Sequence, residues 1–225
     1  MEALGGYPAK SSSPKARTLR VVVSMTVGVG CLLLLQTQLN PRKPADFYAF
    51  AVRDAKGRPV SLEKYRGKAS LVVNVASRSE QTEANYVSLQ ELHRQLGPSH
   101  FNVLAFPCGQ FGDTETGTSR DIEAFARSTY GVTFPFFSRI KIMGSEADPA
   151  FKFLTDSVQK TPKWNFWKFL VNPEGRVVRF WRTDEPVDSV RQEVTALTVA
   201  MSCHSNACRE NITQQCQLPA PKVRR

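Results

Sequence analysis

The feature of this sequence that most restricts its fold is the run ASLVVNVA at residues 69–76, which contains no charged side chain. A nearly continuous apolar run of this length is typical of a central strand that is covered on both faces. Residues 83–96 follow it with apolar side chains at helical spacing, and Gly97-Pro98 is a stop signal. A second buried strand is expected over 101–106, so the middle of the chain is predicted to be a strand, a helix and a strand.

The flanking segments extend this pattern. A hairpin over 47–60 and a short helical turn over 61–65 are expected before the buried strand. After the second strand we expect a helix opened by a capping box at 118–121, a short strand, and a helix capped by Asp148-Pro149. A hairpin of 166–171 and 176–181 around the turn 172–175 and a helix over 186–200 are expected to follow. This order is the thioredoxin plan. The sequence therefore predicts an α/β, thioredoxin-like fold over 45–201, with a mixed central sheet between helix layers.

An uncharged segment of 19 residues, 21–39, precedes this domain and has basic residues on both sides. As a helix it would span roughly 28 Å, close to the hydrocarbon thickness of a bilayer. We therefore predict one N-terminal transmembrane helix over 21–39, with 1–20 as a cytosolic tail. A cleaved signal peptide and a buried core helix are the competing interpretations; the segment lacks an A-x-A cleavage pattern, and its flanks are charged and rich in proline.

The orientation of this predicted anchor follows from a slight excess of Lys and Arg on its N-terminal side. The excess places the folded domain on the lumenal side, where a sequon at 211–213 would be open to glycosylation. Because one membrane-spanning segment is predicted, we expect a single-pass membrane protein.

The net charge of +10 is spread along the chain and forms no basic stripe with interleaved aromatic residues, so no nucleic acid is expected as a partner. The five cysteines form no zinc-type pairs, so no metal site and no disulfide framework are indicated. Residues 202–225 are predicted to be a polar, disordered tail. Its three cysteines either pair with one another in an oxidising lumen or remain idle thiols.

The functional loop of such a fold lies after the first buried strand and before the helix, where exposed N–H groups favour an anionic nucleophile. Here it reads NVASRSEQT, residues 74–82. This loop resembles the active loop of the glutathione peroxidases, which carries selenocysteine or cysteine two residues after the serine of NVAS. Residues 106–112 (FPCGQFG) and 164–171 (WNFWKFLV) resemble two further motifs of that family, in the same order.

The resemblance covers about 45–200 and is greatest to the membrane-anchored endoplasmic-reticulum branch of the family. It implies reduction of hydrogen peroxide or hydroperoxides with thiol reductants, in response to oxidative stress and without a bound cofactor. Glutathione or a protein dithiol would be the reductant, and protein disulfide isomerases would be partners. This branch often ends in a KDEL-like retrieval signal, whereas the present sequence ends in PKVRR, so retention is expected to depend on the anchor.

Carried over residue by residue, the resemblance places Ser79 at the nucleophile's position and Gln110, Trp164 and Asn165 around it. Glu80 stands where the family usually has glycine. A serine hydroxyl has no oxidation ladder comparable with that of a thiolate, so peroxide turnover at Ser79 is in doubt. The alternative function is a non-catalytic thioredoxin-like binding module for lumenal oxidoreductases or membrane partners.

Cys108 is the one thiol inside the predicted domain. It is interpreted either as a small buried apolar residue at a strand end or as a redox thiol that peroxide oxidises and an external dithiol reduces.

Overall fold

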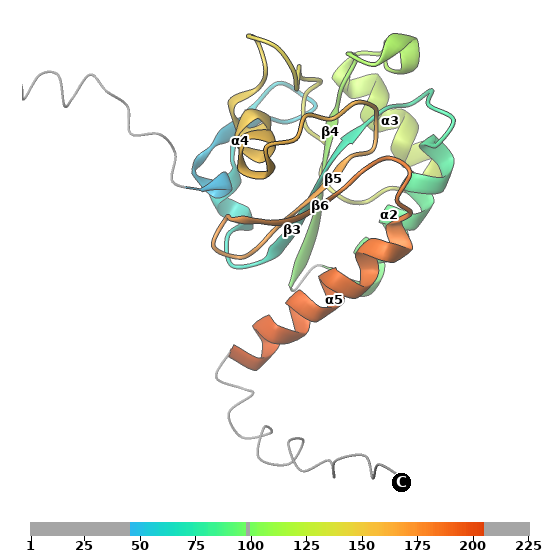
Figure 1. Cartoon of the computed structure of the whole chain (residues 1–225). Helices are drawn as coiled ribbons and strands as arrows, with labels where there is room; N and C mark the ends of the chain where they lie inside the picture. The colour runs from blue at the N-terminus through green and yellow to red at the C-terminus, as the bar shows by residue number, and fades with distance from the viewer. Residues whose placement is uncertain (1–45, 98–99, 205–225) are drawn as a thin grey trace, which may run out of the picture. The chain divides into compact units, whose positions relative to one another are not determined.

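The computed structural model describes residues 46–97 and 100–204, and a four-stranded mixed sheet lies at their centre (Figure 1). The strands are β3 (Ala69–Val75), β4 (Phe101–Pro107), β5 (Lys168–Val171) and β6 (Val177–Trp181), in the order β4-β3-β5-β6. β3 runs parallel to β4 and antiparallel to β5, which is antiparallel to β6. All seven residues of β3 are buried, which confirms the central strand predicted from the apolar run.

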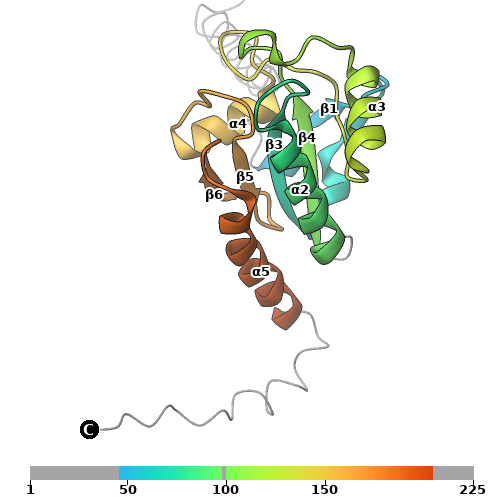
Figure 2. The ribbon, with the colours of Figure 1, turned by 90° about the vertical axis from the view of Figure 1, so that its right-hand side faces the viewer.

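Helices cover both faces of this sheet. Leu71 and Val73 of β3 pack into a core shared with α2 (Thr82–Leu96), α3 (Ser119–Tyr130) and α5 (Val187–His204). Val72 points the other way, into a core shared with α4 (Pro149–Val158). Figure 1 shows α4 on one side of the sheet and α2 and α3 on the other, and in Figure 2 α2 and α5 lie side by side in front of the strands. The mixed sheet between helix layers is therefore confirmed.

The helix starts lie where the sequence predicts them. Thr118 and Asp121 form the capping box that opens α3, and the Asp148 side chain accepts the first backbone N–H groups of α4. α2 ends at Leu96, before the predicted stop signal.

Four details differ from the sequence predictions. Phe47–Ala49 form a 3-10 helix, η1, rather than part of a strand, because the Asp46 side chain caps them. The short strand expected between the second and third helices is reduced to isolated bridges at Phe136, Phe137 and Ile140. The strand predicted from residue 166 begins at Lys168, since Phe166 has a φ of +62°. The last helix runs on to His204.

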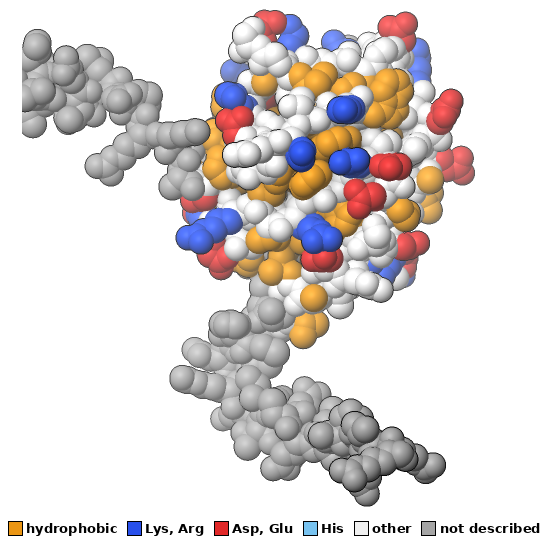
Figure 3. Space-filling view, in the orientation of Figure 1, with side chains coloured by type: hydrophobic (Ala, Val, Ile, Leu, Met, Phe, Trp, Pro, Cys, Tyr) orange, Lys and Arg blue, Asp and Glu red, His pale blue; other side chains and the backbone are white. Residues whose placement is uncertain are grey.

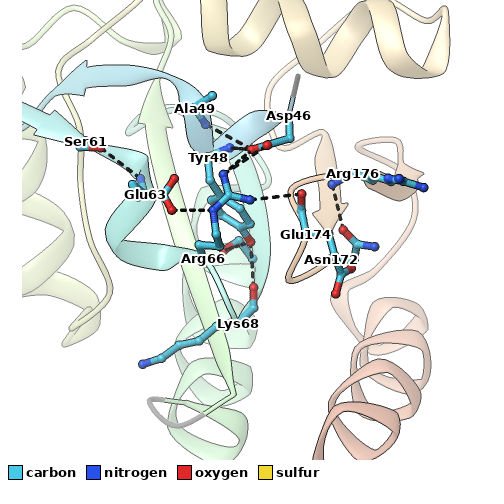
Figure 4. Close-up of polar contacts among 11 residues, drawn as sticks. Asp46, Tyr48, Ala49, Ser61, Glu63, Arg66, Lys68, Asn172, Glu174 and Arg176 are labelled. Carbon is cyan, nitrogen blue, oxygen red and sulfur yellow. Dashed lines mark hydrogen bonds and ion pairs between the residues drawn. The ribbon is translucent and has the colours of Figure 1, made fainter. Parts of the chain in front are cut away.

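The beginning of the described chain is fastened to the rest of the domain by a polar cluster (Figure 4). Arg66 donates to the carboxylate of Asp46 at 2.9 Å and to that of Glu63 at 2.6 Å. The N–H of Phe47 donates to the carbonyl of Gly175, in the turn between β5 and β6, at 2.9 Å. A small hairpin of β1 (Ala51–Arg53) and β2 (Pro59–Ser61) and the 3-10 turn η2 (Leu62–Tyr65) follow.

Residues 202–204 of the predicted disordered tail 202–225 are helical, as the end of the last helix. The predicted tail 1–20, the predicted anchor 21–39 and residues 205–225 lie outside the described residues. Among the residues from 46 to 204 that are described, none of the helices has the length and apolarity needed to span a bilayer.

Candidate functional site

Three segments of the chain meet at one edge of the sheet. Because β3 and β4 are parallel and in register, Val75 and Pro107 lie side by side where the two strands end. β5 is antiparallel to β3, so its first residue, Lys168, pairs with Val73 near the same edge. The loops 76–81, 108–114 and 164–167 therefore come together, and these loops contain every site residue predicted from the sequence.

Asn74, the one amide in β3, fixes the Trp164 segment to this edge. Its side-chain N–H donates to the carbonyl of Trp164 at 3.1 Å, and its side-chain oxygen accepts the N–H of Trp167 at 2.9 Å. Its backbone carbonyl accepts the N–H of Phe166 at 2.7 Å. The backbone N–H of Asn74 also donates to the carbonyl of Trp167 at 3.4 Å. Four hydrogen bonds from one residue therefore hold the segment and offset the positive φ of Phe166.

Asn165 is fully buried between two of the loops. Its amide N–H donates to the hydroxyl of Thr114 at 2.8 Å, and the carbonyl of Thr114 accepts the N–H of Arg78 at 2.9 Å. Thr114 thus joins Asn165 to the loop that contains Ser79. The side-chain oxygen of Asn165 has no hydrogen-bond partner among the described residues, so it is available to accept a hydrogen bond.

Ser79 lies in the turn that leads into α2 and is 8% exposed. Its N–H donates to the Thr82 hydroxyl at 3.0 Å, and that hydroxyl donates to the carbonyl of Ala76 at 3.0 Å. The Ser79 hydroxyl accepts only a long 3.5 Å contact from the N–H of Gln81. The loop is therefore held by its backbone and by Thr82, and the Ser79 oxygen lies near the positive end of the α2 dipole.

Gln110 is held by a different part of the chain. Its amide N–H donates to the carbonyl of Met143 at 3.0 Å, while its oxygen accepts the N–H groups of Ile142 at 2.6 Å and Met143 at 3.0 Å. The structure thus brings Gln110 to the same sheet edge as the other predicted residues, but its amide is bonded to the backbone of 142–143.

Cys108 is fully buried in the core on the α4 side of the sheet. Burial raises the pKa of its thiol, so the thiol is neutral at pH 7 and is a weak nucleophile. Its sulfur lies 3.8 Å from the side-chain oxygen of Gln110. These features fit the interpretation of Cys108 as a packed apolar residue better than that of a reactive thiol.

An open cavity of about 580 Å³ lies beside these loops. Trp164 forms part of its wall and is 44% exposed, whereas Ser79, Gln110 and Asn165 are not part of the lining. Figure 3 shows one face of the molecule, on which apolar side chains reach the surface among charged ones. The residues that give the cavity its mixed aromatic and charged wall are Trp164, Trp167, Lys160, Lys163, Arg182 and Asp184.

Two buried charged residues near the site were not singled out as site residues from the sequence. Glu115 is 3% exposed and accepts the hydroxyl of Ser77 at 2.8 Å; burial raises the pKa of its carboxyl. Lys168 is fully buried, and burial lowers the pKa of its ammonium to about 8. The signal for Lys168 was present in the sequence, since a lysine in a predicted core strand is unusual. Within the described residues, no cluster of three or more His, Cys, Asp or Glu side chains could hold a metal ion.

Comparison with known proteins agrees with these features. Residues 47–155 match the family model described as glutathione peroxidase. The chain is 83% identical over 198 residues to a protein of Tetraodon nigroviridis named "Probable glutathione peroxidase 8", covering 88% of this chain and 94% of that protein. It is 56% identical over 197 residues to the human protein of the same name, with the same coverage.

Solved structures show the same fold. The crystal structure of Trgpx in apo form has a TM-score of 0.57 at 30% identity, over 69% of this chain and 96% of that one. The crystal structure of T. cruzi GPX1 has a TM-score of 0.58 at 28% identity, over 68% and 97%. The predicted thioredoxin-like fold is thereby confirmed.

Proposed function

The chain belongs to the glutathione peroxidase family, and on this premise we propose that its folded domain is a peroxidase-type site for hydrogen peroxide or organic hydroperoxides. Where a thiol performs the reduction in such a site, glutathione or a protein dithiol would be the reductant. The observation that supports this proposal is the meeting of loops 76–81, 108–114 and 164–167 at the carboxyl end of β3.

Ser79 restricts the chemistry that the proposed site can perform. In a cysteine-dependent peroxidase the thiolate sulfur attacks one oxygen of the peroxide, the O–O bond breaks, an alcohol or water leaves and the sulfur becomes a sulfenic acid. A second thiol then forms a disulfide and releases water. A hydroxyl oxygen cannot undergo this two-electron oxidation, so we propose that Ser79 occupies the nucleophile's place in a site that has lost its electron donor.

The test is peroxide consumption by the full chain, its Ser79→Cys variant and its Cys108→Ser variant, each with glutathione or a dithiol. We expect the original chain to be no faster than Cys108→Ser, and Ser79→Cys to be faster and to form a sulfenic acid at residue 79. Ser79→Cys combined with Asn165→Leu should lose the gain. A Ser79→Cys protein that folds but neither consumes peroxide nor becomes oxidised at that position would refute the proposed site.

We further propose that the protein is a single-pass membrane protein of the endoplasmic reticulum, with the folded domain in the lumen and protein disulfide isomerases among its partners. The support is the uncharged segment 21–39 with its basic flanks. Extraction of membranes at alkaline pH, and protection of the domain from added protease, test this topology. Release of the domain by alkali, or its digestion in intact vesicles, would contradict it.

A second candidate function is a binding module without turnover. The backbone bonds that occupy the Gln110 amide and the burial of Cys108 favour it, because both residues are then structural. The open cavity with its exposed Trp164 would be the binding surface. Capture of lumenal oxidoreductases should survive Ser79→Ala and be lost in Trp164→Ala; equal capture by both variants and by an unrelated anchored domain would refute it.

A further inference from the structure

Lys168 is a charged residue at a position where burial of an apolar side chain would cost less free energy. It is the first residue of β5, pairs with Val73 and Trp181, and is fully buried. Removing an ammonium from water is costly unless its protons find good acceptors. The hydrogen bonds of Lys168 therefore indicate what this residue contributes.

The ammonium joins two segments that are distant in sequence. It donates to the carbonyl of Phe166 at 3.0 Å and to the carbonyl of Glu185 at 3.1 Å. The acidic side chains that face it, from the turn before α5, are those of Asp184 and Glu185, and both favour the charged ammonium. The bonds to two carbonyls are charge-assisted, so they are stronger than bonds between neutral groups.

Each of the two segments forms part of the wall of the open cavity, which Gln81 and residues from 159–163 also line. Trp164 lines it from the side of Phe166, while Thr183 and Asp184 line it from the side of Glu185. The hydroxyl of Thr183 also donates to the carbonyl of Asn165. Hydrogen bonds from Lys168 and from Thr183 thus connect these two parts of the wall, and Lys168 is the one of these two residues that is fully buried.

The same bond stabilises an unfavourable backbone conformation. Phe166 is a bulky residue with a φ of +62°, a region that such residues rarely adopt. Trp164 and Asn165 immediately precede it, so a change in the Phe166 backbone changes the direction of both side chains. The Trp164 indole packs against the Phe111 ring with centroids 6.0 Å apart, and this contact depends on that direction.

We propose that Lys168 is a positioning residue, whose buried ammonium holds the 164–166 and 183–185 segments together and thereby sets Trp164 and Asn165 in the site. This inference deepens the proposed function and rests on it for the identity of the site. The placement of Trp164 can nevertheless be measured without any peroxide turnover, so the two proposals fail separately.

The test uses tryptophan fluorescence of the full chain. The chain has three tryptophans, and Trp167 and Trp181 are 5% and 2% exposed, so quenching by acrylamide reports chiefly on Trp164. In Lys168→Met we expect the Trp164 contribution to the quenching constant to rise toward about twofold, as its exposure moves from 44% toward that of a free side chain. Lys168→Gln keeps a donor N–H, so its quenching constant should lie between that of the original chain and that of Lys168→Met.

Two controls separate positioning from stability. Leu92→Ala removes buried volume from α2, on a part of the core that does not line the cavity, and should lower the melting temperature without changing the quenching of the folded protein. Trp164→Phe should abolish the effect of Lys168→Met. If Lys168→Met does not fold, Lys168→Gln decides. A folded Lys168 variant whose quenching equals that of the original chain overturns the proposal.

Discussion

The side chain of Asn74 in β3 donates to the backbone carbonyl of Trp164 at 3.1 Å, across 90 positions of sequence. Its oxygen accepts the N–H of Trp167 from the same segment. The single amide in a run of buried apolar residues is therefore the part of β3 that holds the third loop of the site. A polar group in a core is retained where its hydrogen bonds are complete.

Replacement of Asn74 by leucine should lower the free energy of unfolding by about 1–3 kcal/mol, because the buried N–H of Trp167 loses its acceptor. Urea denaturation measures this loss. Asn102→Leu in β4 is the matched control: Asn102 is also buried, but its amide nitrogen has no partner in the part of the chain that the structure describes. Equal losses in the two variants would contradict the importance of the Asn74 bonds.

The thiol of Cys108 should react slowly with alkylating reagents in the native protein at pH 7–8 and rapidly in urea. The sulfur is fully buried, and burial raises the pKa of the thiol, which lowers its thiolate fraction. Alkylation followed by mass spectrometry of the peptide that contains Cys108 distinguishes it from the other four cysteines. Labelling as fast in native protein as in urea would show that this thiol is accessible after all.

Lys168 should make the stability of the domain depend on pH between about 8 and 10.5. Burial lowers the pKa of its ammonium from 10.5 to about 8 in the folded state. As the pH falls through this window, the unfolded chain takes up a proton before the folded chain does, so the free energy of unfolding decreases, by about 3 kcal/mol in total. Stability from this residue therefore rises with pH.

Lys168→Met removes that proton uptake. The difference in free energy of unfolding between the original chain and Lys168→Met should accordingly shift in favour of the original chain as the pH is raised from 8 to 10. Tyrosine ionisation is common to both proteins and cancels in the difference. A difference that stays constant across this range would mean that the ammonium titrates normally in the folded protein.

Gly175→Ala should destabilise the domain more than Gly57→Ala. Both glycines have nearly the same positive φ, +84° and +81°, so the backbone cost of alanine, about 1–2 kcal/mol, is shared. A Cβ at Gly175 would lie 2.6 Å from the carboxylate oxygen of Asp46, whereas a Cβ at Gly57 meets nothing within 4 Å. Thermal unfolding of the two variants measures the extra cost of displacing Asp46, and equal melting temperatures would show that Asp46 moves aside freely.

Much of the fold could be predicted because the sequence patterns that specify its helices and strands involve residues close together in the chain. The apolar run of β3, the capping box of Thr118 and Asp121, and the Asp148-Pro149 helix start each depend on neighbouring residues. The sheet edge where Ser79, Gln110, Trp164 and Asn165 come together also follows from the strand order and from the resemblance to a known family.

The thioredoxin-like order of elements, the three loops of the site and the oxygen at position 79 all follow from the amino-acid sequence. The contacts of the side chains become visible in the folded domain: Gln110 is bonded to residues 142–143, Cys108 is buried in the core, and Lys168 joins two parts of the wall of a cavity. Secondary structure follows from spacing along the chain. Burial, pKa and hydrogen-bond partners arise from contacts between distant segments, which spacing does not encode.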